Sequence, residues 1–486
     1  MVTKKAADVE NLETDIVVLG AGGSGLAAAV AAAEAGSKVI VLEKRSKAGG
    51  NTAMAVGLFA CESPVQKRLR IDVSKDECFK IAMNYSHWKI NPRIVRAFID
   101  KSGDTIKWLE DRGLKIERIF PAFPNQKHLV WHVPEKWGAG LIDLMLKHCD
   151  EHHVQVFYKI AAKKILTDKD GRITGVLAEN KKEKKTYQIT ANNIIIATGG
   201  YGGNKQMIRK YYPGYHDDIQ CRGVPNKGDG ILMAMELGAA TEGLGILHSG
   251  APHFRGAYDL WTVALNPEAV WLNKNAERFI DESVGLLYFE SVNALKRQPH
   301  KICYSLFDDK IKKNIVEEGL VTWATITFST EKKPLSDLDE ELKRANQKGN
   351  AKIANSWNDI AKWAGIAPEY INASIEEYNR SCTNGHDKIF AKDRKYLKPL
   401  DSPPYYALEC HDAFLGTIGG IKINHHMEVM DNNDKPIGGL YAVGIDSGGW
   451  EGENYCGILS GTTFGFAINS GRIAGENAAR RKKSNG

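Results

Sequence analysis

The chain has 486 residues, which is too long for one simple core and suggests two or three domains. Its hydrophobic content of 43% is ordinary for a globular protein, and its formal net charge of +6 is too small to indicate nucleic-acid binding. The eight cysteines form no CxxC or CxxCH motif, which excludes the usual zinc, redox dithiol and c-type haem patterns, so we expect no bound metal.

The two ends of the chain carry charge. The amino end has charged residues where a signal peptide needs an apolar core, and the alanine-rich segment 26–35 is too short to cross a membrane. The basic run 480–483 is interpreted as a solvated tail rather than a membrane or nucleic-acid patch. We therefore expect a cytoplasmic protein without a membrane span.

The first recognisable unit lies at residues 15–50. An apolar strand at 16–19 leads into a glycine turn, an alanine-rich helix and a second strand at 39–42 that ends in Glu43. This order is typical of a dinucleotide-binding unit, because the glycines let a pyrophosphate approach the helix amino terminus and the acid accepts hydrogen bonds from ribose. The predicted contacts here are Gly20, Gly22, Gly23, Ser24, Gly25, Glu43 and Lys44.

Further glycine turns follow along the chain. One begins at Gly49, a buried strand at 193–197 ends in a second, Asp229 opens another helix, and the strand at 439–443 ends in a third. Several phosphate-binding turns in one chain suit a large dinucleotide held extended, which favours FAD over NAD. The further predicted contacts are Gly49, Gly50, Asn51, Thr52, Ala162, Thr198, Gly199, Gly200, Asp229, Gly444 and Ser460.

Motifs along nearly the whole chain resemble one flavoprotein family, that of fumarate reductases, succinate dehydrogenase flavoprotein subunits and 3-ketosteroid 1-dehydrogenases. They include DIVVLGAGGSGLAAAVAAAEAG, GGNTAMAVG, IIIATGGYGGN, GDGILMAMELGA, NKNAERFIDE, GTIGGIKI and GGLYAVG, in that order. The resemblance implies an α/β fold with a discontinuous Rossmann-type, glutathione-reductase-like FAD-binding domain at 1–245 and 404–486. An α+β capping domain is then inserted at 246–403. Asn51 stands where succinate dehydrogenases carry a histidine bonded to FAD, so noncovalent FAD is implied.

The motifs that bind a dicarboxylate in fumarate reductases are changed here. Those enzymes hold carboxylates with arginine and histidine, because carboxylates need charge-assisted donors. Their HHTMGG pattern reads LGTIGG at 415–420, and the arginine of their GANR pattern is replaced by Tyr455. The arginine that should follow the RFxNE motif is absent from 281–288. These three differences argue against a dicarboxylate substrate.

A tyrosine at position 455 resembles the 3-ketosteroid 1-dehydrogenases instead. A phenol can donate to a ketone oxygen and stabilise the enolate that forms beside it. We therefore expect an FAD-dependent oxidoreductase that introduces or reduces a C=C bond conjugated to a ketone, of a steroid-like or alicyclic type. The resemblance implies that Tyr455 polarises the carbonyl with a backbone N–H near Leu459, that Tyr288 is the candidate base, and that flavin N5 exchanges hydride.

Two other functions remain open at this point. One is an enoate or enoyl C=C reductase of the fumarate-reductase type, with anion contacts from Arg278 or Arg255. The other is a non-catalytic flavin subunit that passes electrons within a complex. The expected partners are a small ketone or enone substrate and an electron donor or acceptor such as a quinone or a small redox protein, with no nucleic acid.

Overall fold

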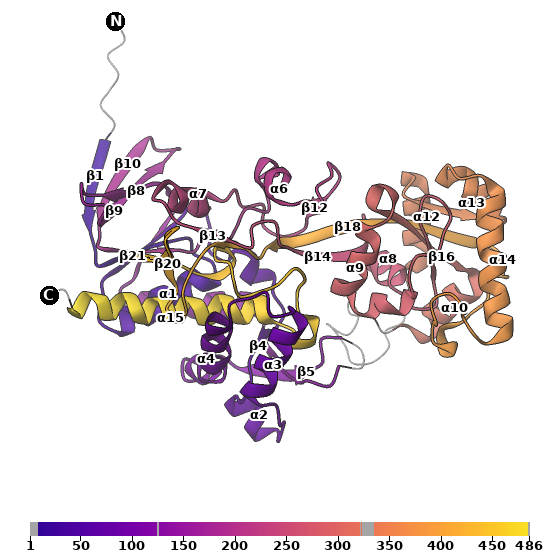
Figure 1. Ribbon diagram of the computed structural model, residues 1–486, viewed down its shortest axis with the longest axis horizontal. Helices are drawn as coiled ribbons and strands as arrows, with labels where there is room; N and C mark the ends of the chain where they lie inside the picture. Colours follow the sequence, from indigo (N-terminus) through magenta and orange to yellow (C-terminus); the bar gives the residue numbers. More distant parts are fainter. Residues whose placement is uncertain (1–7, 124–125, 321, 323–334, 485–486) are drawn as a thin grey trace, which may run out of the picture.

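The computed structural model describes residues 8–123, 126–320, 322 and 335–484. The molecule is elongated and has two lobes (Figure 1). The larger lobe contains both described ends of the chain, and the smaller lobe is formed by the middle of the chain. Within the described residues, no helix combines the length and apolar character that a membrane crossing requires.

The larger lobe is built on a six-stranded sheet with the order β20-β21-β11-β2-β3-β7. Five neighbouring strands run parallel, and only the edge strand β20 is antiparallel. The central strands are continuous apolar runs because both faces of a parallel sheet are covered. The strands are β20 (Glu428–Met430), β21 (Pro436–Ala442), β11 (Asn193–Ile196), β2 (Ile16–Leu19), β3 (Val39–Glu43) and β7 (Gln155–Tyr158).

Two helices pack closely beside this sheet: α1 (Gly23–Glu34) and α15 (Thr462–Ser484). A Cβ on Gly471 would lie 2.1 Å from the Ser24 carbonyl oxygen, and one on Gly475 would lie 2.3 Å from the Ala28 oxygen. Alanines of α1 and glycines of α15 therefore let the two backbones approach each other. This packing holds the carboxyl-terminal segment against the first glycine turn.

Smaller sheets and helices complete the larger lobe. A four-stranded sheet has the order β1-β10-β9-β8, a three-stranded sheet the order β4-β6-β5, and β13 pairs with β19. The strands are β1 (Asp8–Glu13), β10 (Lys185–Thr190), β9 (Ile173–Asn180), β8 (Ala161–Thr167), β4 (Leu58–Phe59), β6 (Trp131–Pro134), β5 (Ile116–Phe120), β13 (Thr241–Glu242) and β19 (Gly420–Ile421). The helices are α2 (Pro64–Arg68), α3 (Lys75–Tyr85), α4 (Pro92–Glu110), α5 (Trp137–Glu151), α6 (Lys205–Tyr211) and α7 (Asp229–Glu236).

The smaller lobe contains a mostly antiparallel sheet with the order β12-β18-β16-β15, to which β14 and β17 add by pairing with β18. The strands are β12 (Gln220–Cys221), β18 (Tyr405–Thr417), β16 (Ile302–Asp308), β15 (Val270–Leu272), β14 (Leu247–Phe254) and β17 (Ala351–Ala354). The helices around them are α8 (Tyr258–Ala264), α9 (Tyr288–Lys296), α10 (Asp309–Glu318), α12 (Leu338–Lys348), α13 (Trp357–Ala364) and α14 (Pro368–Asn384).

The long strands β14 and β18 run side by side between the two lobes (Figure 1). Buried side chains between Ala251 and Cys410 form one hydrophobic core, whereas those from Ile16 to Leu247 and from Phe414 to Ala478 form another. We propose that these two cores correspond to the two predicted domains, since each would then bury its own apolar surface. A third, smaller aromatic cluster joins residues of both lobes.

Candidate functional site

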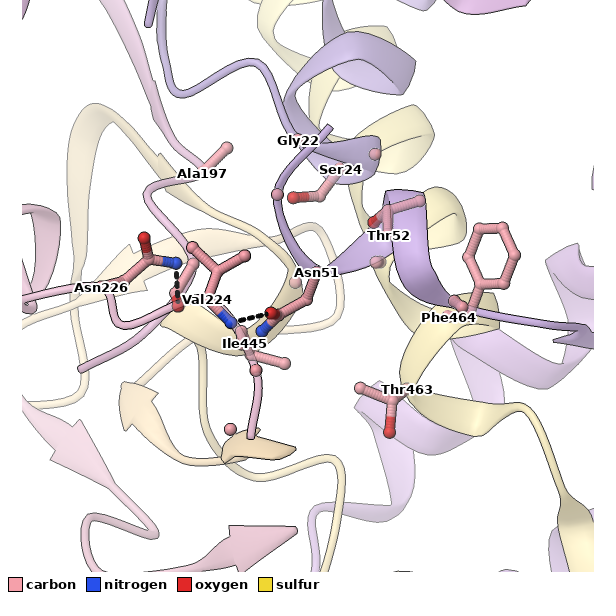
Figure 2. A pocket seen from close by; sticks show the side chains of 18 of the residues that line it. Gly22, Ser24, Asn51, Thr52, Ala197, Val224, Asn226, Ile445, Thr463 and Phe464 are labelled. Carbon is pink, nitrogen blue, oxygen red and sulfur yellow. Dashed lines mark hydrogen bonds between the residues drawn. The ribbon is translucent and has the colours of Figure 1, made fainter. Parts of the chain in front are cut away.

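A cavity of about 360 Å³ opens at the carboxyl ends of strands β2, β3 and β11. These ends meet at one edge of the parallel sheet, which is where ligands bind in open α/β folds. Figure 2 shows that residues far apart in sequence surround the cavity, among them Ser24, Asn51, Val224 and Thr463. Of the predicted cofactor residues, the following line it: Gly20, Gly22, Gly23, Ser24, Glu43, Lys44, Gly50, Asn51, Thr52, Ala162, Thr198, Gly199, Asp229, Gly444 and Ser460.

The first glycine turn depends on close backbone contacts. Gly20 has a φ of 111°, and a Cβ there would lie 2.3 Å from the Ala197 carbonyl oxygen. Gly25 does not line the cavity, but a Cβ on it would lie 1.9 Å from the Gly20 oxygen. Gly25 therefore serves the packing of helix α1 against the turn, as the third glycine of such motifs does.

Glu43 holds this turn in place from the end of β3. Its buried carboxylate accepts a hydrogen bond from the Ala21 N–H at 2.9 Å and another from the Arg45 N–H at 2.8 Å. The carboxylate lines the cavity with lone pairs that can accept from ribose hydroxyls. The next residue, Lys44, forms a 2.7 Å ion pair with Asp229 from helix α7.

The second glycine turn leads into the short 3₁₀ helix η1 (Gly50–Met54). Gly49 lies behind the cavity surface, with a φ of 130° and its N–H donating to the Ala21 carbonyl at 2.9 Å. Asn51 accepts from the Val224 N–H at 2.6 Å, a bond drawn in Figure 2. The amide of Asn51 therefore ties this turn to a segment far away in sequence.

The turn after β11 is organised by Asp446, a residue that the sequence analysis did not identify. Its buried carboxylate accepts from the Thr198 hydroxyl at 3.0 Å and from the N–H groups of Gly199 and Gly200 at 2.9 and 2.8 Å. Burial raises the pKa of Asp446, and these donors oppose that rise. Gly200 is thus held behind the cavity wall, whereas Thr198 and Gly199 line it.

Five aromatic side chains line one part of the cavity, which we call the aromatic end: Phe123, Trp131, His248, Phe289 and Tyr455. The rings of His248 and Tyr455 stack with centroids 4.1 Å apart, and Phe289 lies 4.8 Å from Tyr455 and 5.9 Å from Phe123. His248 comes from β14 and Phe289 from α9, whereas Tyr455 follows the last strand of the larger lobe. Both lobes therefore build the aromatic end.

The Tyr455 hydroxyl accepts a hydrogen bond from the Gly461 N–H at 2.7 Å. Burial raises the pKa of Tyr455, so the phenol is neutral and can donate its own proton. Burial lowers the pKa of His248 to about 3, which keeps its imidazole neutral, and its Nε2 has no hydrogen-bond partner among the described residues. These two side chains can offer neutral hydrogen-bonding groups to a ligand.

Two predicted catalytic residues lie away from the cavity lining. Tyr288 is buried where helix α9 begins, and its ring packs against Gly250 and lies 5.3 Å from the Trp261 ring. The Leu459 N–H donates to the Cys456 carbonyl at 3.1 Å. The N–H that reaches the Tyr455 hydroxyl is that of Gly461, two residues further along. The role of Tyr288 as the base therefore stays a prediction.

The two arginines considered as anion contacts also have other partners. Arg278 bonds both oxygens of Glu282 at 2.9 Å and Asp387 at 3.0 Å, inside the smaller lobe. Arg255 donates to the Asp218 carbonyl at 2.8 Å. Among the described residues, the Lys and Arg side chains that line the cavity are Lys44 and Arg45, which both follow the dinucleotide acid. No arginine of the described chain lines the aromatic end.

The residues that line the cavity fit FAD. Three glycine turns from separate segments expose backbone to one cavity, and Glu43 is placed for a ribose. Ser460 and Gly461 lie where helix α15 begins, and the first N–H groups of a helix favour negative charge on a bound group. These residues would hold the dinucleotide and the ring system that carries the chemistry.

Comparison with known proteins agrees with this fit. A family model described as an FAD binding domain matches residues 15–458. A vinyl phenol reductase of Lactiplantibacillus plantarum is 32% identical over 96% of both chains. The structure of a flavocytochrome c3 fumarate reductase in its open conformation matches with a TM-score of 0.75 and 24% identity, covering 96% of this chain and 78% of that one.

A second solved structure, a 3-ketosteroid Δ1-dehydrogenase of Sterolibacterium denitrificans with a bound dienedione, matches with a TM-score of 0.79. It is 19% identical and covers 96% of this chain and 100% of that one, so it supports the fold alone. The curated relatives are named as reductases and dehydrogenases. Together these findings confirm the predicted fold class and cofactor, and the chain belongs to this FAD-binding family as an FAD-dependent oxidoreductase acting on C=C bonds.

Proposed function

We propose that this protein reduces, or in reverse introduces, a C=C bond conjugated to a ketone in a planar, uncharged molecule. The observation that supports this best is the neutral character of the aromatic end. The Trp131 indole N–H donates to the Gly57 carbonyl, and the other polar groups of these five rings are the Tyr455 phenol and the His248 imidazole, both uncharged because they are buried. Carboxylates need cationic partners in such a dry site, whereas a ketone oxygen needs only a neutral donor.

Tyr455 has the central part in this proposal. The Gly461 N–H occupies one acceptor site of the phenol oxygen, which leaves the phenol proton available for the substrate oxygen. A hydrogen bond from that proton stabilises the negative charge that develops on the oxygen as the C=C bond reacts. When bound, FAD supplies or accepts the hydride.

The surrounding rings select the shape of the substrate. Phe123 and Phe289 are buried and stand edge to face at an interplanar angle of 84°. Flat unsaturated molecules gain stacking and apolar burial in such surroundings. Phe123 belongs to the larger lobe and Phe289 to the smaller, so a bound molecule would contact both lobes.

A second substrate class, a hydroxystyrene, is favoured by the relationship to the vinyl phenol reductase. Such a substrate is also planar and uncharged, and its phenol group could bond to His248 Nε2. Both classes share the absence of a carboxylate. The electron partner in either case is proposed to be a quinone or a small redox protein.

Anaerobic reoxidation of the photoreduced flavin tests the proposal. The purified holoprotein would be mixed with an aryl enone, a steroid dienone, 4-vinylphenol, fumarate and urocanate, and flavin absorbance would be followed. We expect rapid reoxidation by an enone and slow or no reoxidation by fumarate. Reoxidation by 4-vinylphenol alone would select the second class, and reoxidation by fumarate alone would refute both. If a partner protein reduces the flavin and no small molecule reoxidises it, the electron-transfer alternative is correct.

A further inference from the structure

A buried acid lies close to the Tyr455 phenol, on the side where helix α15 begins. Glu451 is only 5% exposed, and its Oε2 accepts from the Thr462 hydroxyl at 3.3 Å. The Thr462 hydroxyl is also a close neighbour of the Tyr455 phenol, which accepts at 2.7 Å from the N–H of the preceding residue, Gly461. Three exchangeable groups, a carboxyl and two hydroxyls, therefore lie in one row that ends at the aromatic end of the cavity.

We propose that Glu451 supplies the proton that restores Tyr455 after each reduction, with the Thr462 hydroxyl as the intermediate carrier. This inference rests on the function proposed above. Glu451 is not among the described residues that line the cavity, so it would act on the substrate only by way of Tyr455.

The proton transfers balance as follows. As one alkene carbon receives hydride from the reduced flavin, the O–H bond of Tyr455 breaks and its proton passes to the substrate. The Thr462 hydroxyl then turns from Glu451 and gives its proton to the Tyr455 oxygen, and the proton of the Glu451 carboxyl moves to the Thr462 oxygen. A hydroxyl can do this because it accepts one proton while releasing its own. Glu451 is left as a carboxylate and must recover a proton from water.

The surroundings of Glu451 suit this task. Burial raises its pKa to about 8, so the carboxyl holds its proton at neutral pH and can still release it. A small second cavity of about 20 Å³ is lined by Glu451, Thr462 and Cys456. That volume is large enough for one water molecule, which could return the proton.

The other ionisable groups nearby come from α3, α9 and the segment before η6 (Gly457–Leu459). They are Tyr85, Glu290, Tyr455 and Cys456, and burial raises the pKa of each of them. Desolvation outweighs the hydrogen bonds that oppose it at Glu451, and no cation contributes to its pKa. Glu451 is therefore placed to change its protonation as the pH passes through about 8.

The test uses the holoenzyme and four variants. Glu451→Gln removes the acid, Thr462→Val removes the carrier hydroxyl, and Thr462→Ser keeps it. Glu290→Gln removes a second, partly buried acid that forms no hydrogen bond with Thr462 among the described residues. Steady-state turnover would be measured from pH 6 to pH 10 for each protein, with excess reduced viologen dye as electron donor and the substrate that reoxidises the wild-type flavin fastest, because only repeated turnover requires Tyr455 to be reprotonated.

We expect the wild-type rate to fall as the pH rises through about 8. Glu451→Gln and Thr462→Val should react roughly tenfold more slowly at pH 7 and lose this pH dependence. Thr462→Ser should restore it, and Glu290→Gln should behave like the wild type. If Glu451→Gln instead follows the wild-type pH profile, the relay does not exist.

A measurement without substrate separates this inference from the proposed function. Infrared difference spectra of the oxidised protein should contain the carbonyl band of a protonated carboxyl at pH 7. We expect this band to vanish in Glu451→Gln and to persist in Glu290→Gln. An ionised Glu451 at pH 7 would overturn the relay even if enones are substrates, whereas failure of every enone would overturn only the ketone class.

Discussion

At the scale of single residues, the proposed function depends on neutral hydrogen-bond donors at the position where a dicarboxylate site would carry charged ones. The motif resemblance aligns Tyr455 with an arginine of the fumarate reductases. Its phenol is held by the Gly461 N–H and stacks on His248, so it cannot swing freely. A donor fixed before the reaction stabilises developing charge without reorganisation.

Tyr455→Phe should therefore keep FAD bound and lose about two orders of magnitude or more in turnover, the loss seen when one oxyanion donor is removed. The ring still packs on His248, so the fold should survive. Flavin absorbance after gel filtration checks the first expectation, and single-turnover kinetics check the second. Unchanged turnover would exclude the phenol from the reaction.

Single catalytic residues are harder to predict than motifs, and the roles of Tyr288 and Leu459 stay predictions. Tyr288 rests on the family resemblance alone, and helix α9 begins at that residue and directs its ring toward Gly250 and Trp261. No local motif marks His248 or Phe289 in the sequence, because these side chains line the cavity only when β14 and α9 pack beside Tyr455. No sequence spacing encodes such a contact.

At the scale of elements, the glycine turns were predictable because a short stretch of sequence is enough to identify each of them. A strand, a turn that only glycine permits and a helix start follow one another within a few residues, as at Gly20 and Gly49. What joins these turns was not predictable. Asp446 and Asn51 connect segments separated by well over a hundred residues. Asp446 carries no motif in the sequence, and Asn51 is predicted there only as a cofactor contact.

Asp446→Asn tests one of these connections. The carboxylate accepts from a hydroxyl and two N–H groups, whereas an amide would turn an NH₂ group toward one of them. We expect a loss of about 1–3 kcal/mol in the free energy of unfolding and weaker FAD binding, because a buried donor is left unpaired. Chemical denaturation and FAD titration would measure both, with the exposed Asp434→Asn as a control. An unchanged unfolding free energy would mean that water replaces the lost acceptor.

At the scale of the whole molecule, the site lies where two cores meet. The larger lobe supplies the glycine turns and Tyr455, and the smaller lobe supplies His248 and Phe289 through β14 and α9. The predicted α/β fold with an inserted α+β part was recognisable from the order of motifs along the chain. The relative position of the lobes was not, because it depends on long-range pairing of β14 with β18.

This arrangement makes one property of the cavity decisive for the proposed function: no Lys or Arg side chain of the described residues lines its aromatic end. A carboxylate buried there would lose its hydration without gaining a charged partner, at a cost of several kcal/mol. A methyl ketone of the same shape would gain the hydrogen bond from Tyr455 without that cost. Two substrates that differ only in this group therefore distinguish a site for ketones from a site for carboxylates.

The most direct measurement is the ratio of kcat/KM for benzylideneacetone to that for cinnamate, which share a phenyl ring and a C=C bond and differ in ketone against carboxylate. The account predicts a ratio of about 100 or more in favour of the ketone, since each 1.4 kcal/mol corresponds to a factor of ten. A ratio near one, or a preference for cinnamate, would contradict it.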